Sequence, residues 1–197
     1  DALQSQINPH FLYNTLECIR GQAIVVGNRP IADMARALSE FFRYSISRAT
    51  HLVTVEDELR NVSAYMKIQN YRFGEKYQVR ISMDESDRPF ILQCLLPRLT
   101  IQPIIENALL HGLHDSDREK EYLDISLELT DSRLILSVAD HGAGMSQKQM
   151  DRLNTSMRDD TPHTGGSGEP QRRHSGIALQ DINEGIRLLF GRDYGLR

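Results

Sequence analysis

The chain has 197 residues, of which 40% are hydrophobic and 25% are charged, and its formal net charge is -4. These values are ordinary for a folded globular protein, and the length allows one domain or a helical module joined to a compact α/β domain. The Lys and Arg residues are scattered, which argues against a nucleic-acid partner because phosphate binding needs a concentrated basic face. Polar residues and two prolines interrupt the most apolar run, FILQCLLPRLTIQPII, so it does not predict a membrane span.

The first 50 residues predict a helical hairpin. Apolar residues recur at helical spacing from Leu3 to about Val26, the break GNRP follows, and a second stripe extends from Ile31 to about Tyr44. A short break makes the two helices antiparallel neighbours. Two helices offer too little surface to bury both stripes, so we predict a homodimer that completes a four-helix bundle.

Residues 51–197 have the character of a compact α/β domain. Thr54 and Asp57 resemble a capping box at the start of a helix. The alternating segment 77–83 predicts a strand. A further helix is expected from Pro97 to Gly112, because proline favours a first helical turn and glycine a helix end.

The second half of this domain predicts a strand hairpin followed by helices. Segments 122–129 and 133–140 alternate strictly on either side of the turn TDS, which is typical of antiparallel strands. Short helices are expected over 146–157 and from Gly176 to Phe190. Between them, 158–174 is rich in Gly, Pro and polar residues and is predicted to be mobile.

The segment IIENALLHG places three candidate functional residues, Glu106, Asn107 and His111, on one helix. An Asn amide oxygen suits a hard cation such as the Mg²⁺ that bridges nucleotide phosphates. For this segment alone, an ordinary surface Asn is the favoured interpretation. His111 and His114 lack a third ligand, so we interpret them as local structure rather than as a metal pair.

Two glycine-containing segments follow. VADHGAGMS ends a strand in Asp140, whose carboxylate could accept a hydrogen bond from an exocyclic amine such as adenine N6, and continues into Gly142 and Gly144, which permit close backbone approach to a ligand. HSGIALQDIN opens a helix at Gly176, where free backbone amides could face a phosphate. Taken singly, the first could be a simple turn and the second a simple glycine N-cap.

In order and spacing these three segments, with the polar insert, resemble the N, G1 and G2 boxes and the ATP lid of the Bergerat ATP-binding fold. QINPHFLYNTL resembles the phosphoacceptor box of sensor histidine kinases of the LytS/YehU-like type. The resemblance covers nearly the whole chain. It implies an α+β protein with two domains: a helical hairpin over 1–50 that dimerises as a four-helix bundle, and an α/β two-layer sandwich of the Bergerat type over 51–197 that lacks its last strands.

The resemblance also implies the function: the core of a two-component sensor histidine kinase that autophosphorylates His10 from Mg-ATP and passes the phosphoryl group to an aspartate on a response regulator receiver domain. It makes Asn107 the Mg²⁺ ligand and Asp140 the adenine-binding carboxylate. The other nucleotide-binding residues would be His111, Gly142, Gly144 and Gly176. The chain would be the cytoplasmic portion of a bacterial membrane sensor whose membrane segments lie elsewhere in a larger parent protein.

Three positions depart from the usual pattern of such kinases. Leu110 stands where a phosphate-binding Lys is common, Ala178 replaces a glycine of the last box, and Gly185 occupies a usual Arg position. These departures leave open a catalytically weak or inactive nucleotide-binding dimer that regulates a partner. The phosphoacceptor box argues against a third possibility, a purely hydrolytic ATPase.

The surroundings of His10 predict how it could accept a phosphoryl group. Pro9 is expected to remove the helical hydrogen bond to the carbonyl of Ser5 and to bend the helix beside His10. Gln6 and Asn14 lie four residues away on the same helical face, where their amides could hold a neutral ring. By itself, His10 could equally be a partly buried helix histidine.

The residue after His10 is Phe11 rather than an acid. Proton removal from the ring must therefore be assisted from elsewhere in the protein. Glu106 is our candidate for this general base.

Overall fold

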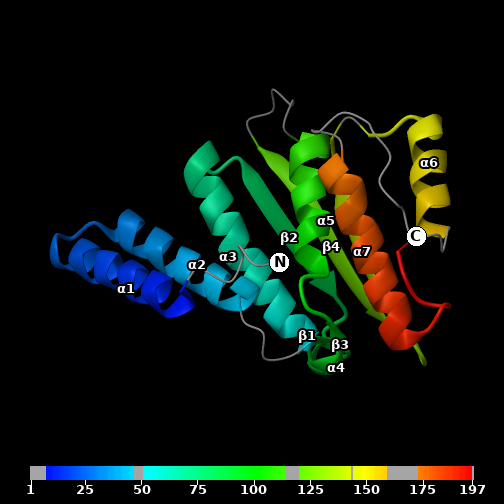
Figure 1. The fold of residues 1–197 in the computed structure, drawn as a ribbon, viewed down its shortest axis with the longest axis horizontal. Coiled ribbons are helices and arrows are strands. Elements are labelled where there is room, and N and C mark those ends of the chain that lie inside the picture. Colours follow the sequence, from blue (N-terminus) through cyan, green and yellow to red (C-terminus); the bar gives the residue numbers. More distant parts are fainter. Residues whose placement is uncertain (1–7, 47–50, 114–119, 143, 159–172, 197) are drawn as a thin grey trace.

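The computed structural model describes residues 8–46, 51–113, 120–142, 144–158 and 173–196. Helices and strands occur together in this part of the chain, and the predicted α+β class is confirmed (Figure 1). Most of the insert predicted to be mobile lies outside the described residues.

Helices α1 (Pro9–Val25) and α2 (Arg29–Ile46) pack side by side and confirm the predicted hairpin (Figure 1). The break between them is defined by Gly27, whose φ of +72° suits a residue without a β-carbon. The Asn28 side chain accepts a hydrogen bond from the backbone amide of Ile31 at 3.3 Å and so caps the start of α2. The buried residues of the two helices are mostly small: Leu16, Ala23, Ala32, Ala35, Ala37 and Ser39.

A three-stranded sheet has the order β2 (Tyr77–Met83), β4 (Glu121–Leu129) and β5 (Leu134–Asp140). β2 and β4 are parallel, whereas β4 and β5 form the predicted antiparallel hairpin. Asp140 pairs with Leu123, so the end of β5 lies beside the start of β4. All three predicted strands are confirmed.

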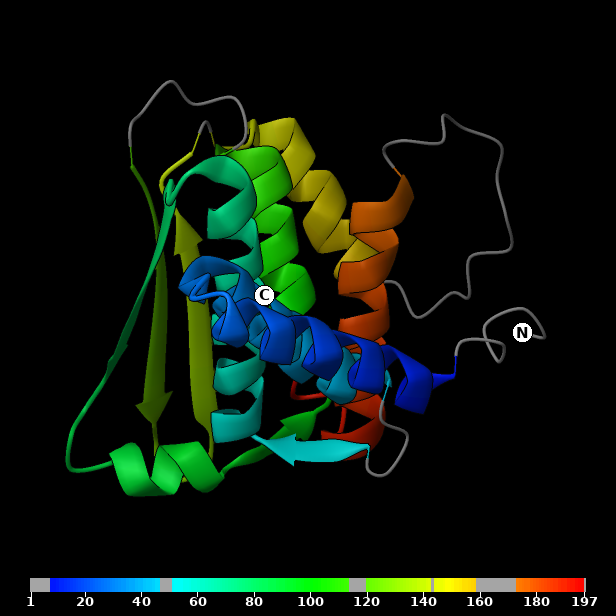
Figure 2. The same cartoon turned by 90° about the vertical axis from the view of Figure 1, so that its left-hand side faces the viewer.

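Helices cover one face of this sheet. Figure 2 shows α3 (Val55–Phe73), α5 (Ile101–Asn107) and α7 (Arg173–Phe190) on the same side of the strands. Alternate residues of β4 point into the resulting core, as the period of two in a strand requires. The core comprises, among others, Val55, Val62, Ile91, Ile101, Ile105, Leu123, Ile125 and Leu127, each at most 3% exposed.

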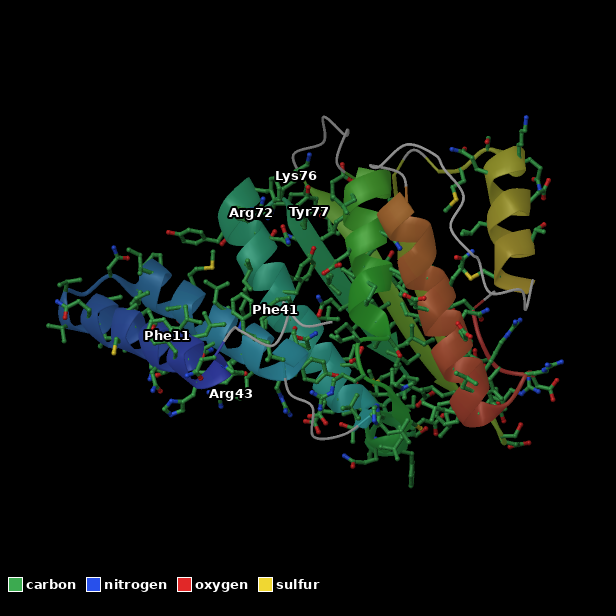
Figure 3. All side chains as sticks on the ribbon, viewed as in Figure 1. Phe11, Phe41, Arg43, Arg72, Lys76 and Tyr77 are labelled. Atoms are coloured by element: carbon green, nitrogen blue, oxygen red, sulfur yellow. The ribbon has the colours of Figure 1, made fainter. Side chains whose placement is uncertain are left out.

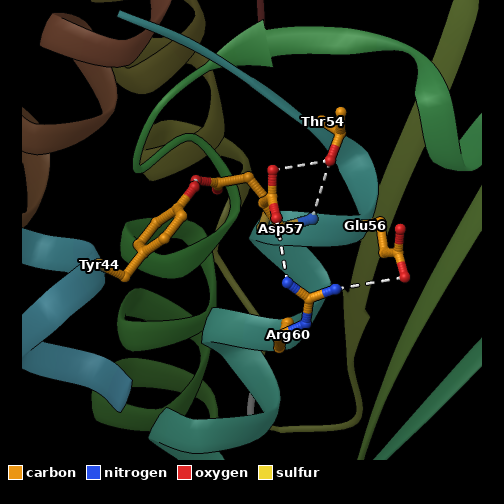
Figure 4. A network of polar contacts seen from close by, with 6 residues as sticks. Tyr44, Thr54, Glu56, Asp57 and Arg60 are labelled. Carbon is orange, nitrogen blue, oxygen red and sulfur yellow. Dashed lines mark hydrogen bonds and ion pairs between the residues drawn. The ribbon is translucent and has the colours of Figure 1, made fainter. Parts of the chain in front are cut away.

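The start of α3 was predicted correctly. Thr54 is its N-cap, and the Thr54 hydroxyl oxygen accepts a hydrogen bond from the Asp57 amide at 3.2 Å. The same hydroxyl donates to the Asp57 carboxylate at 2.9 Å (Figure 4). Local capping chemistry therefore fixes this helix end.

The predicted start of the next helix at Pro97 is wrong. Pro97 belongs to β3 (Leu95–Pro97), which pairs antiparallel with β1 (Leu52–Thr54), and α5 begins only at Ile101. Between them Leu99 has φ of +61°, which a helix does not allow. This pairing with a distant strand overrides the local preference of proline for a helix start.

Three more elements complete the described fold. A short helix that the sequence pattern did not predict, α4 (Arg88–Gln93), precedes β3. α5 continues into π-helical turns over Ala108–Leu113. The helix expected over 146–157 is α6 (Gln147–Arg158), and α7 starts three residues before the predicted Gly176.

The hairpin contacts the rest of the fold through α3. We call this remainder, the described residues from 51 to 196, the sheet domain. The ring centroids of Phe41 on α2 and Tyr65 on α3 are 6.0 Å apart, and Figure 3 shows Phe41 where the two helices meet. Within the described residues, no helix combines the length and the apolar character needed to cross a membrane.

Candidate functional site

His10 lies in the first turn of α1 and is exposed. The bend predicted at Pro9 is wrong, because Asn8 has an extended backbone and the helix begins at Pro9 itself. The Asn8 side chain accepts hydrogen bonds from the amides of His10 at 3.1 Å and Phe11 at 3.3 Å. Proline at this position costs no helical hydrogen bond, since the first helical amides have no acceptor within the helix.

Asn14 contacts the His10 ring, as its spacing predicted. Its amide nitrogen lies 3.2 Å from Nδ1 and 3.4 Å from Nε2 of His10. An amide nitrogen donates, so this contact places a hydrogen-bond donor beside the His10 ring. Gln6, the other predicted partner, lies outside the described residues.

The predicted nucleotide-binding elements meet at one end of the sheet domain. The C-terminal end of α5, the end of β5 and the start of α7 lie together there (Figure 1), and we call this region the nucleotide end. Asn107 ends α5, Asp140 ends β5, and Gly176 lies in the first turn of α7. α1, whose first turn carries His10, lies apart from the nucleotide end in both ribbon views (Figures 1 and 2).

Asn107 is the last residue of α5 and is partly buried. Its amide nitrogen is buried and has no hydrogen-bond partner among the described residues. Buried polar atoms without partners are rare in folded proteins and call for an explanation. The orphan atom is a donor and cannot ligate a cation, so it does not by itself support a metal role for the amide oxygen.

Asp140 is exposed at the end of β5. Its Oδ1 accepts a hydrogen bond from the Gly142 amide at 3.0 Å, which orients the carboxylate. Gly144 has φ of +72°, a conformation that would strain a residue with a β-carbon. Asp140 is therefore held by a local turn, as the simpler interpretation proposed, and still presents its second oxygen for a donor.

Glu106 is held from α3 through two amides. The Gln102 side-chain amide donates from Nε2 to the Glu106 carboxylate at 2.8 Å. Its Oε1 in turn accepts a hydrogen bond from the Asn61 side chain on α3 at 2.6 Å. Burial, and next the nearby Glu106 carboxylate, raise the pKa of Tyr65 to about 12. The Glu106 side chain therefore faces the α3 side of its helix.

The remaining predicted site residues are only partly described. His111 lies in the π-helical turns and its side chain is outside the described part, as is all of His114. Gly176 lies in the first turn of α7, three residues after the helix begins at Arg173, rather than at its cap. Of the positions that depart from the kinase pattern, Leu110 is 62% exposed.

Sequence reasoning missed one polar contact beside this region. His141 Nε2 lies 2.7 Å from the carboxylate of Asp124, on the neighbouring strand β4. The strand register could have suggested it, because Asp124 pairs with Ala139, two residues before His141. Within the described residues, no three His, Cys, Asp or Glu side chains gather as a metal site.

A second missed contact joins the two parts of the molecule. Tyr44 at the end of α2 donates its hydroxyl hydrogen to the carboxylate of Glu58, which lies in α3 and is 0% exposed. Burial, and then the hydrogen bond to Glu58, raise the pKa of Tyr44 well above its usual value. No local sequence signal links these two residues.

Comparison with known proteins identifies the family. The family model for histidine kinase matches residues 1–77. Sensor histidine kinase YesM of Bacillus subtilis is 35% identical over 196 residues, which are 100% of this chain and 30% of that protein. Sensor histidine kinase BtsS of Escherichia coli is 32% identical over 197 residues, or 98% of this chain and 29% of that protein.

Sensor protein kinase HptS of Staphylococcus aureus is 33% identical over 168 residues, which are 83% of this chain and 30% of that protein. The chain thus spans about 30% of the length of these curated relatives. The similarity extends along the whole chain and points to the same family as the motifs around His10, Asn107 and Asp140. The chain belongs to the histidine kinase family, among the sensor kinases of the LytS/YehU-like type.

Proposed function

We propose that this segment is the kinase core of a two-component sensor. Its substrate would be Mg-ATP bound at the nucleotide end, its product a phosphohistidine at His10, and its partner a response regulator receiver domain whose aspartate takes the phosphoryl group. The observation that supports the proposal is that the ends of α5 and β5 and the start of α7 lie at one end of a fold whose hairpin carries an exposed His10.

The residues at the nucleotide end have the chemistry that such a substrate needs. Asn107 offers an amide oxygen for Mg²⁺, which would neutralise phosphate charge when bound. The free oxygen of Asp140 is an acceptor for the adenine amine. Gly142, Gly144 and Gly176, which have no side chain, would let the backbone approach the nucleotide.

His10 would act as the nucleophile. Its exposure leaves a ring nitrogen accessible to the γ-phosphorus, and the contact from the Asn14 amide would orient the ring for attack. As the nitrogen–phosphorus bond forms and ADP leaves, the proton on the ring must pass to a base. Glu106 is the proposed base, and Gln102 would orient it.

The two parts of the fold would divide this work. Residues 1–50 would form the dimerisation and phosphotransfer domain, and 51–197 an ATP-binding domain of the Bergerat type. The one-sided cover of the sheet by α3, α5 and α7 supports a two-layer sandwich. The parent protein would be a membrane sensor, with this segment in the bacterial cytoplasm.

The hairpin would dimerise with a second copy into a four-helix bundle. Phe11, Cys18 and Val25 repeat every seven residues on α1 and are all exposed, Phe11 to 69% and Val25 to 80%. An exposed apolar seam of this period is typical of a helix that packs against another helix. Light scattering should give the mass of a dimer, and a strictly monomeric species would contradict this part of the proposal.

The kinase activity is tested with Mg-ATP labelled at the γ-phosphate. We expect acid-labile, alkali-stable label on the protein, lost in His10→Gln and kept in the matched control His51→Gln, which alters another exposed histidine. Label that persists in His10→Gln would contradict the assignment of the phosphoacceptor.

The departures at Leu110, Ala178 and Gly185 favour a second candidate function, a nucleotide-binding dimer that regulates a partner without transferring phosphate. The same experiment separates the two. Absence of label, together with measurable binding of Mg-ADP, would support the binding module over the kinase.

A further inference from the structure

Glu58 is a buried carboxylate that the proposed reaction does not use. It lies in the first turns of α3 and is 0% exposed. Three donors converge on it: the Tyr44 hydroxyl and the amides of Leu99 at 2.6 Å and Ile101 at 2.8 Å. A buried carboxylate is tolerated only when its oxygens are satisfied in this way.

Two of these donors set the start of α5. Leu99 has φ of +61°, an uncommon conformation for a residue with a side chain, and must be held by its surroundings. Thr100, at the N-cap position, makes no capping hydrogen bond through its side chain. Glu58 therefore replaces the missing cap from a neighbouring helix.

The third donor comes from the hairpin. Figure 4 shows Tyr44 reaching from α2 toward the first turn of α3. Tyr44 is also held from the α5 side, because Arg98 donates from Nη1 to its carbonyl oxygen at 2.9 Å and stacks with its guanidinium carbon 5.0 Å from the ring centroid. The end of α2 and the start of α5 therefore meet in one cluster of contacts around Tyr44, Glu58 and Arg98, which we call the joint.

We propose that Glu58 is a positioning residue for α5 and that Tyr44 is the residue through which the hairpin controls it. α5 ends in Glu106 and Asn107, so a shift at its start moves the residues proposed to act on substrate. A rotation of α2 that withdraws the Tyr44 hydroxyl would leave Glu58 short of a donor and loosen its hold on Leu99. The consequence for nucleotide binding rests on the proposed function, whereas the joint itself does not.

Tyr44→Phe tests this inference, since it removes the hydroxyl and keeps the ring that stacks on Arg98. The matched control is Tyr13→Phe, which removes another hairpin hydroxyl, one that donates to the Phe42 carbonyl and does not reach Glu58. The first readout is hydrogen exchange of the Leu99 and Ile101 amides, followed by NMR. The second is the dissociation constant for Mg-ADP.

We expect Tyr44→Phe to speed exchange of both amides by about tenfold or more, the low end for losing a hydrogen bond to a charged group, and to weaken Mg-ADP binding severalfold. Tyr13→Phe should change neither. Glu58→Gln should have larger effects of the same kind, and adding Tyr44→Phe to it should weaken binding no further, because both act through one joint. If Glu58→Gln does not fold, the exchange and binding measured for Tyr44→Phe are sufficient to test the inference.

Unchanged exchange in Tyr44→Phe would overturn the control of α5 by the hairpin. Faster exchange with unchanged Mg-ADP affinity would overturn the positioning role. If the unaltered protein fails to bind Mg-ADP, the proposed function fails, and the exchange data still decide whether Tyr44 holds α5.

Discussion

Replacing Glu106 by Gln tests the proposed base with little disturbance of the fold. The Gln102 amide donates to the Glu106 oxygen at 2.8 Å, and a glutamine carbonyl can accept the same hydrogen bond. The cost to the free energy of unfolding should therefore stay below about 1 kcal/mol. What disappears is the negative charge and the ability to take a proton.

Loss of a general base typically slows a reaction by about 10²- to 10⁴-fold. We expect a decrease of this size in the single-turnover rate of His10 phosphorylation at saturating Mg-ATP, with unchanged affinity for Mg-ADP. The charge also contributes to the raised pKa of Tyr65, so that pKa should fall toward its ordinary value in an ultraviolet titration. This spectroscopic change confirms that the substitution acted where intended.

The matched control is Glu128→Gln, which removes an exposed carboxylate from β4. It should leave the rate and the pKa of Tyr65 unchanged. If Glu106→Gln lowers the pKa of Tyr65 and phosphorylates His10 at the original rate, Glu106 is not the base and the reasoning is refuted.

Three further predictions concern the hairpin contact, the alkaline stability and the core. Asn14→Ala removes the donor that faces the His10 ring and should slow phosphorylation without changing Mg-ADP affinity; an equal rate would remove Asn14 from the site. The pKa of Tyr65 is about 12 in the folded protein and about 10 when unfolded, so its contribution to stability is full below about pH 10 and is lost as the pH rises toward 12. In urea unfolding at pH 9 and pH 11, Tyr65→Phe should lose less stability than the original protein, and an identical loss would contradict the buried phenol. Ile125→Ala, at a residue 0% exposed, should lower the free energy of unfolding by about 2–5 kcal/mol, whereas a loss under about 1 kcal/mol would mean that the sheet face is not packed as described.

Local periodicity explains which elements the sequence predicted. The strand Tyr77–Met83 has the predicted bounds because its alternation needs no knowledge of its neighbours. The Thr54 cap was predicted for the same reason, since its partner is three residues away. Each of these signals is complete within a few residues.

Elements that depend on distant pairing were not predicted. Pro97 has the local signature of a helix start, yet it pairs with Leu52 in a strand, and no local pattern reveals that contact. Asn8 followed by Pro9 is a typical helix start. The apolar repeat that precedes Pro9 suggested instead a helix that continues through it, and this second signal was given more weight. Competing local signals of similar strength can be decided only by tertiary contacts.

The same distinction holds at the site. Residue type and spacing identified His10, Asn107 and Asp140 as candidates, because their chemistry is visible in single residues. Contacts between distant elements were not visible: Asn61 on α3 donates to the side chain of Gln102 on α5, and Tyr44 on α2 donates to Glu58 on α3. Supporting contacts of this kind are properties of the packed fold.

The central claim is that this segment binds Mg-ATP at the nucleotide end, where Asp140 would hold adenine. Calorimetric titration with Mg-ADP tests it most directly, using Asp140→Asn and the matched control Asp131→Asn, an exposed residue of the β4–β5 turn. We predict binding to the unaltered protein and to the control, and an affinity weakened by about tenfold or more in Asp140→Asn. The Asn oxygen would stay with the Gly142 amide, and the Asn NH2 group cannot accept from the adenine amine. Failure of the unaltered protein to bind, or equal affinity in Asp140→Asn, would contradict the claim.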